Sequence, residues 1–315
     1  MRLDQALQFS DAAIHQCALA ALDALLQAQY PNGAWPQGFQ GPPDPLQHPV
    51  LPARYPQEWS REYVKQDYWR FYTLNDDALA TTIDTMFLAY AIYADERYRQ
   101  AAMKAGDFLL LAQMPEPQPA WAQQYDFQMH PTWARKFEPP AVTGGESQGA
   151  IRIHLRIYEE TGERKYLEPV PKALDYLSRS ALPDGRLARF YELQTNRPLY
   201  FTRQYQLTYD DSDLPTHYGF KVDNRTAELR AQYEALLKLT AKQLAERRAA
   251  RYRQKRSRPS TEAVRTIIAQ LDPRGAWVEP GRLRTYGADD PTREVISSRT
   301  FIKNIDILSR FLAER

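Results

Sequence analysis

The sequence has 315 residues, of which 43% are hydrophobic, and its formal net charge is +2. A chain of this length can bury one large core or two ordinary ones, and its near-neutral charge gives no argument for a nucleic-acid partner. The single cysteine, Cys17, excludes an intramolecular disulfide. No apolar run approaches the roughly 20 residues that span a bilayer, and the first residues lack the features of a secretory signal. The sequence therefore predicts a globular protein that binds neither nucleic acid nor membrane.

Seven segments have the apolar spacing or the composition of helices. They are residues 11–29, 77–93, 97–113, 146–160, 164–179, 225–258 and 299–314. The sixth is highly charged and ends in a basic run, which we interpret as a solvated helix face. Residues 38–74 are rich in proline and aromatic residues and predict a long ordered loop. Little of the sequence alternates with a period of two, and the best strand candidate is 199–211, which we expect to form a local hairpin.

Four segments share one pattern, in which an apolar helix ends at a proline and usually a glycine, followed by an aromatic or basic residue. They are residues 25–37, 109–123, 176–190 and 267–281. Proline and glycine after a helix are stop signals. Because the units are long and uneven, the pattern predicts a ring of α-hairpins with the turns gathered at one end, and not a regular solenoid.

The stretch 121–147 lies between two helical segments and is not itself helical, because three prolines interrupt it. Gly144-Gly145 predicts a tight turn with positive φ. The stretch is rich in ionisable side chains, namely Asp126, His130, Arg135, Lys136, Glu138 and Glu146. A loop of this kind is either a functional site or a solvated connection.

Asn75-Asp76-Asp77 precedes the most regular helix of the sequence. One of these residues suffices as the helix N-cap. The other carboxylate would then lie at the mouth of the ring, where it could bind a hard cation such as Ca²⁺.

A second cluster, in residues 188–203, places three arginines around apolar residues. They are Arg189, Arg197 and Arg203. Guanidinium groups in such surroundings recognise a carboxylate or phosphate, or pair with internal glutamates. Because these arginines and Arg135 outnumber Glu138 and Glu192, the sequence favours an anionic ligand. It contains no zinc-type histidine spacing, phosphate-binding loop or nucleophile motif.

Five motifs, QYPNGAWPQ, LNDDA, WAQQYD, ARKFEPPAVTGGES and RFYELQTNRPLYFTR, occur in the order seen in the family 10 polysaccharide lyases that cleave pectate. The resemblance covers residues 20–220, with a weaker tail at 297–312. It implies an all-α fold, an (α/α) toroid or barrel of helical hairpins with long irregular loops at one end. It also implies calcium-dependent cleavage of polygalacturonate by β-elimination. A monomeric, secreted or periplasmic protein with an acidic polysaccharide as its partner would follow.

Residue by residue, the resemblance makes Asp76 a Ca²⁺ ligand with Asp77 beside it, and Asp126 matches a further family aspartate. Arg135 matches the arginine proposed as the base that takes the proton from C5. The expected substrate-binding residues are Arg189, Arg203, Arg197, Lys136 and Trp35. We expect a single domain over 1–315. Because SDAAIHQ at 10–16 does not match an earlier Asp-Asn helix of the family, either the family's first helices are missing from this chain or its calcium site is altered.

Two other functions stay open on the sequence alone. One is a non-catalytic or divergent homologue that binds uronate oligosaccharides and has an altered metal site. The other is a glycoside hydrolase on an α/α barrel, which needs two facing carboxylates. Glu138 with Glu146 or Asp126 could supply them.

Overall fold

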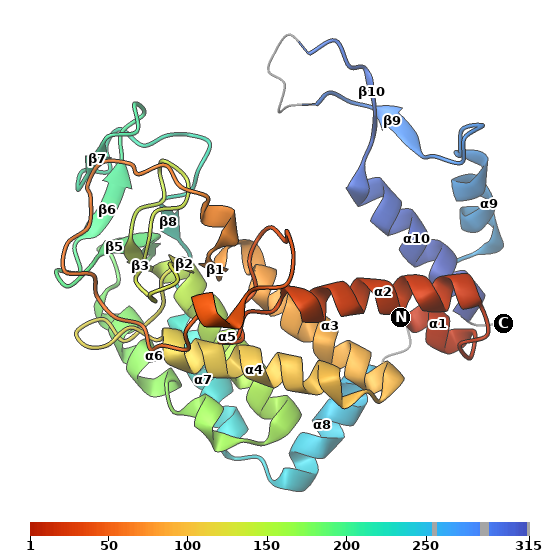
Figure 1. Cartoon of the computed structure of the whole chain (residues 1–315), viewed down its shortest axis with the longest axis horizontal. Coiled ribbons are helices and arrows are strands. Elements are labelled where there is room, and N and C mark those ends of the chain that lie inside the picture. The colour runs from red at the N-terminus through yellow and green to blue at the C-terminus, as the bar shows by residue number, and fades with distance from the viewer. Residues whose placement is uncertain (254–256, 284–289, 314–315) are drawn as a thin grey trace. The chain divides into compact units, whose positions relative to one another are not determined.

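The computed structural model describes residues 1–253, 257–283 and 290–313 (Figure 1). The chain forms two compact units. The larger unit spans Leu22–Tyr252, and the smaller one combines Met1–Ala21 with Arg253–Arg315. The single domain expected over 1–315 stays a prediction. None of the helices described is long and apolar enough to cross a membrane.

Helices make up most of the regular structure, which confirms the predicted all-α class. The α-helices are α1 (Arg2–Ala6), α2 (Ala12–Ala28), α3 (Ala78–Tyr93), α4 (Glu96–Ala112), α5 (Gly144–Thr161), α6 (Val170–Arg179), α7 (Thr226–Leu237), α8 (Ala241–Arg253), α9 (Thr261–Ala269) and α10 (Ser298–Ala313). Short 3₁₀ turns are η1 (Pro45–Gln47), η2 (Tyr68–Arg70), η3 (Asn75–Asp77) and η4 (Arg164–Leu167). Apart from α1 and α9, which no predicted segment covers, these helices match the predicted segments to within a few residues, with the exceptions described below.

In the larger unit, helices that follow one another in the chain pack side by side. α3 packs along α4, α4 packs on α5, and α5 contacts both α6 and α7 (Figure 1). The contact between α4 and α5 requires a small residue at Gly106, where a Cβ would lie 2.7 Å from Ile157 Cδ1. On α5 the buried residues Ile151, Leu155 and Tyr158 recur at helical spacing and face this core.

The strands are short, and those of the larger unit gather on one side of it with the long loops (Figure 1). They are β1 (Tyr72–Thr73), β2 (Gln124–Tyr125), β3 (Ala141–Thr143), β4 (Leu187–Ala188), β5 (Phe190–Glu192), β6 (Pro198–Phe201), β7 (Leu207–Thr208) and β8 (Lys221–Val222). The antiparallel sheets are β3-β5-β6-β7, β4-β8 and β1-β2. The smaller unit adds β9 (Val278–Pro280) paired with β10 (Glu294–Ile296).

The hairpin predicted in 199–211 is confirmed, because Phe201 of β6 pairs with Leu207 of β7.

Two other expectations were wrong. The charged segment 225–258 forms two helices, α7 and α8, and not one. The second helix has its own start, because the Thr240 hydroxyl accepts a hydrogen bond from the Gln243 N–H in the first turn of α8 (3.3 Å). Residues 254–256 of this segment lie outside the described residues. Gly144 is the first residue of α5 and not part of a left-handed turn. A Cβ there would lie 2.4 Å from the Ala188 carbonyl oxygen, so close approach of β4 is what requires a glycine.

The predicted repeat has a defined geometry at three of its four turns. In each, the N–H of the first residue donates to the carbonyl of the fifth residue. The fourth residue is a glycine, and its N–H donates to the carbonyl of the first residue. The pairs are Tyr30–Ala34, Leu182–Arg186 and Asp272–Ala276, with Gly33, Gly185 and Gly275 donating back. These glycines have φ of 99°, 82° and 78°, which only glycine adopts at no steric cost.

A tryptophan follows three of the repeated turns and plays the same part each time. The indole N–H donates to a carbonyl near the end of the preceding helix in Trp35–Leu25 (2.8 Å), Trp121–Leu109 (2.9 Å) and Trp277–Ile267 (2.8 Å). The repeat is therefore a structural device that closes each helix end against its own turn.

Candidate active site

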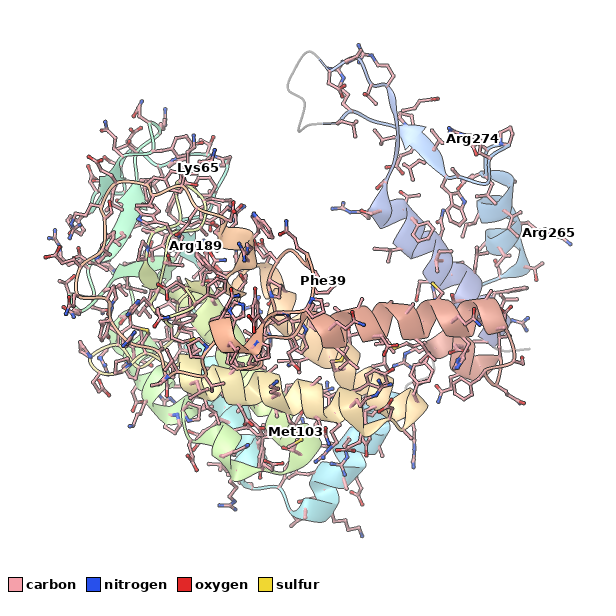
Figure 2. All side chains as sticks on the ribbon, in the orientation of Figure 1. Phe39, Lys65, Met103, Arg189, Arg265 and Arg274 are labelled. Atoms are coloured by element: carbon pink, nitrogen blue, oxygen red, sulfur yellow. The ribbon has the colours of Figure 1, made fainter. Side chains whose placement is uncertain are left out.

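The loop between α4 and α5 carries the central pair of the site, Arg135 and Glu138. Strand β3, at the end of this loop, pairs with β5 and so fixes the loop beside the segment that carries Arg189. Figure 2 shows Arg189 among the side chains on the strand side of the larger unit. The tertiary pairing of β3 with β5, and not sequence proximity, brings these arginines together.

Glu138 is buried, with 1% of its side chain exposed, and its carboxylate accepts hydrogen bonds from Arg135 and from Tyr218. The Arg135 Nε donates to Glu138 Oε2 at 2.8 Å, its backbone N–H donates at 3.0 Å, and its Nη2 donates to Oε1. The Tyr218 hydroxyl donates to Oε1 at 2.9 Å. The hydrogen bonds with Glu138 raise the pKa of Arg135, and the charge of Asp76 adds to this effect. Arg135 is therefore a cation with a fixed orientation.

Two guanidinium groups converge on the ring of Tyr218. The Cζ of Arg135 lies 5.6 Å from the ring centroid, and that of Arg189 lies 4.8 Å from it. Burial raises the pKa of Tyr218, and Glu138 raises it further, so the phenol is neutral. Arg189 Nε donates to the Gly219 carbonyl, while its Nη1 lies 3.8 Å from Glu146, beyond hydrogen-bond distance. Arg189 thus keeps donors available for a ligand.

A hollow of about 360 Å³ is lined by Arg189, whereas Arg135 and Tyr218 are not among its lining residues. It lies between η3, the first turns of α5 and residues 223–225, and its charged lining consists of Asp76, Asp77, Glu146, Arg152, Arg189, Asp223 and Arg225. Asp76 and Asp77 both have left-handed backbone conformations, with φ of 57° and 54°. Such conformations cost a non-glycine residue energy and are concentrated at functional sites. The hollow therefore combines backbone strain with charges of both signs.

The predicted metal residues divide into two groups. Asp77 forms an ion pair with Arg152 (2.9 Å), whereas Asp76 makes no hydrogen bond or ion pair with any described side chain. Asp126 lines a separate hollow, where its Oδ1 accepts the backbone N–H groups of Gln128 and His130 at 2.8 and 2.9 Å. Within the described part of the chain, no three His, Cys, Asp or Glu residues form a group that could hold a metal ion. A cation at Asp76 would need ligands from water and from the bound ligand.

Four of the predicted substrate-binding residues are not among those lining the hollow of Asp76 and Arg189. Arg197 lies over the ring of Tyr209 at 3.4 Å, and Lys136 lies over the ring of Tyr205 at 3.6 Å. Arg203 is exposed and pairs with Asp213 at 3.2 Å. Trp35 is 5% exposed and holds the repeated turn described above. Their contact with a substrate stays a prediction.

The sequence patterns missed Tyr218, Arg152 and Arg225. Tyr218 precedes β8, and its position beside Arg189 depends on the pairing of β8 with β4. Arg152 follows Asp77 by 75 residues and meets it across the contact between α3 and α5. No local pattern marks such residues, because their neighbours come from distant parts of the chain.

The model of the pectic acid lyase family matches residues 4–156. Among solved structures, the chain is similar to a mutant of the family 10 polysaccharide lyase from Cellvibrio cellulosa in complex with trigalacturonic acid. The identity is 20%, the match covers 69% of this chain and 71% of that one, and the TM-score is 0.51. A second structure of that family 10 lyase is 19% identical over 70% and 72% of the two chains, with a TM-score of 0.47. The comparison with curated proteins gives no match.

The likeness to the first of these structures confirms the predicted (α/α)-toroid fold. The family match, in turn, includes the Asp76-Asp77 turn, Arg135 and Glu146. The family match covers nearly half of the chain, and with the five ordered motifs it makes residues 4–156 similar to the pectic acid lyase family.

Proposed function

We propose that the protein is a lyase that cleaves polygalacturonate by β-elimination. The observation that carries the proposal is the convergence of Arg135 and Arg189 on the ring of Tyr218, where Arg189 also lines the hollow that holds Asp76. Guanidinium groups bind carboxylates with good geometry, and each sugar unit of polygalacturonate carries one carboxylate. The complex of the similar lyase with trigalacturonic acid supports the same class of substrate.

The two arginines suit the electronic demand of the reaction. β-Elimination removes the proton on C5, next to the uronate carboxylate, and negative charge then develops on that carboxylate. Fixed positive charge beside it lowers the barrier, and removing one such group typically costs about 10²–10³ in rate. Arg189, whose distance to Glu146 is 3.8 Å, is the group we assign to the carboxylate.

We assign Arg135 to the C5 proton, and the structure sets a condition on this role. Its guanidinium is cationic and therefore has no free lone pair. It can accept the C5 proton only after passing one of its own protons to Glu138, along a bond that is already formed. Arg135 and Glu138 would then take up the proton as a pair, with Tyr218 holding the second oxygen of the carboxylate.

We further propose that the lyase depends on Ca²⁺, which Asp76 would hold with Asp77 beside it. Asp76 fits a hard cation, because its carboxylate is exposed and free of partners among the described side chains. Bound there, the ion would supply further positive charge to the uronate carboxylate. Secretion and a monomeric state belong to the same proposal.

Incubation with polygalacturonate tests the proposal through the ultraviolet absorbance of the unsaturated product, with Ca²⁺ or with a chelator. Arg135→Ala should abolish the signal. Arg99→Ala is the matched control, because Arg99 forms a similar pair with Glu96 three residues away but lies on α4 outside the site. Binding of oligouronates without any product would indicate a binding homologue. New reducing ends without a double bond would indicate a hydrolase.

A further inference from the structure

β-Elimination also needs a proton at the leaving oxygen, and the groups assigned so far do not supply one. When the C4–O4 bond breaks, its electron pair stays on O4, and an unprotonated sugar alkoxide is a poor leaving group. Arg189 is a very weak acid, because a guanidinium holds its proton strongly. The inference below rests on the proposed lyase function and asks which residue protonates O4.

Glu146 is a buried carboxyl in the lining of the hollow beside Arg189. It lies in the first turn of α5, and 8% of its side chain is exposed. Its Oε2 has no hydrogen-bond partner in the described part of the chain. Its Oε1 lies 3.8 Å from Arg189 Nη1, which is beyond hydrogen-bond distance. A carboxylate in this position would be poorly solvated.

The contrast with Glu138 is informative. Glu138 accepts three N–H groups of Arg135 and the hydroxyl of Tyr218, so its negative charge is fully compensated. Glu146 lacks such a set of donors. Two carboxyl groups whose charges both raise the pKa of Tyr218 thus have opposite environments, an arrangement that in enzymes separates the residue that stays ionised from the one that carries a proton.

The charges around Glu146 act in both directions. Burial raises the pKa of Glu146 and has the largest effect, and the charge of Glu138 raises it as well. Arg189 lowers the pKa, and the Thr143 hydroxyl and the backbone N–H of Glu146 itself lower it further. The first turn of α5 also favours the charged form through the helix dipole. The other charged groups that line the hollow are Asp76, Asp77, Asp223, Arg152 and Arg225.

We propose that Glu146 is the general acid that protonates the leaving O4. In the balanced step, the C5 proton passes to the Arg135–Glu138 pair, a double bond forms between C4 and C5, and the C4–O4 bond breaks. The proton on Glu146 moves to O4, which leaves as a hydroxyl, and Glu146 becomes a carboxylate. Water then returns a proton to Glu146 and takes one from the pair. When Glu146 is neutral, it does not neutralise the positive charge of Arg189, and that charge can bind the uronate carboxylate.

A substrate whose leaving group needs no proton tests the proposal. The Glu146→Gln variant should turn over polygalacturonate about 10²–10⁴ times more slowly than the parent, the usual contribution of general acid catalysis. With a galacturonide that carries a nitrophenyl group on O4, the loss should shrink to less than about tenfold. Glu228→Gln is the matched control, since Glu228 occupies the first turn of α7 and is exposed. Equal losses on both substrates, or none on polygalacturonate, would overturn the assignment.

An infrared measurement separates this inference from the proposed function. The free protein near pH 7 should show the C=O band of a protonated carboxyl, and Glu146→Gln should remove it while Glu228→Gln keeps it. A protein that turns over neither substrate refutes the lyase and, with it, the acid. A protein that turns over both substrates but lacks the band refutes only the role of Glu146. Circular dichroism spectra that match the parent's exclude misfolding of the variants.

Discussion

Replacing Glu138 with glutamine tests how much of the site depends on one buried carboxylate. Three N–H groups of Arg135 and the Tyr218 hydroxyl bond to this side chain. Glutamine keeps one acceptor oxygen and turns the other into an NH₂ group that faces the guanidinium. Charge-assisted hydrogen bonds contribute about 1.5–3 kcal/mol each, and breaking a buried ion pair costs about 3–5 kcal/mol.

The expected loss lies below that of a fully buried ion pair, because 38% of the Arg135 side chain is exposed and water can solvate the freed guanidinium. We expect Glu138→Gln to lower the free energy of unfolding by about 2–3 kcal/mol in urea titrations. Glu96→Gln is the matched control, because Glu96 also pairs with an arginine three residues away but is exposed. Its loss should be about 0–1 kcal/mol. Equal losses in the two variants would refute the view that Glu138 is the fixed centre of the site.

Three further predictions concern the scaffold. His154 is buried without a hydrogen-bond partner among the described residues, and burial lowers its pKa to about 3. Because the unfolded imidazole takes up a proton below about pH 6.5 and the folded one does not, stability is full above that pH and falls by about 2 kcal/mol at pH 5. His154→Leu should remove that part of the pH dependence in urea titrations, and an unchanged pH profile would contradict the assignment. Gly144→Ala places a Cβ 2.4 Å from the Ala188 carbonyl and should cost more than about 2 kcal/mol, whereas Gly149→Ala in the same helix meets nothing within 4 Å and should stabilise by about 0.5–1 kcal/mol. Thermal unfolding of both variants checks this pair, and equal shifts would count against it. Trp35→Phe loses its bond to Leu25 and should lower stability by about 1 kcal/mol without changing the KM for polygalacturonate. A raised KM would contradict this purely structural role and indicate that Trp35 contacts the substrate.

The helices and the repeated turns could be predicted from the sequence, because both depend on neighbours in the chain. The apolar spacing of 77–93 and 97–113 predicted α3 and α4 nearly to the residue. Three of the four predicted turns after helices share one hydrogen-bonded geometry. The short strands were not predicted, apart from the hairpin of β6 and β7, since two to four residues are too few to show alternation.

The candidate site could be predicted only in part. The motifs identified Arg135, Arg189 and Asp76; the structure places Arg189 with Arg135 at one tyrosine ring and with Asp76 in the lining of one hollow. The same motifs suggested Asp126 and Trp35, which the structure places in another hollow and in the core. A motif gives the type of a residue and its order in the chain, but not the direction in which its side chain points.

By itself, the sequence determined the all-α class, most of the helices and a resemblance to a known family, because periodicity, stop residues and ordered motifs are properties of short stretches. Only the tertiary structure decided which charges meet. The pairings of β3 with β5 and of β4 with β8 bring Arg135, Arg189 and Tyr218 together from segments more than 25 residues apart. The same packing fully compensates Glu138 and leaves Glu146 without a donor for one of its oxygens. Electrostatic environment depends on distance in space, and that distance is fixed by packing between elements that are remote in the chain.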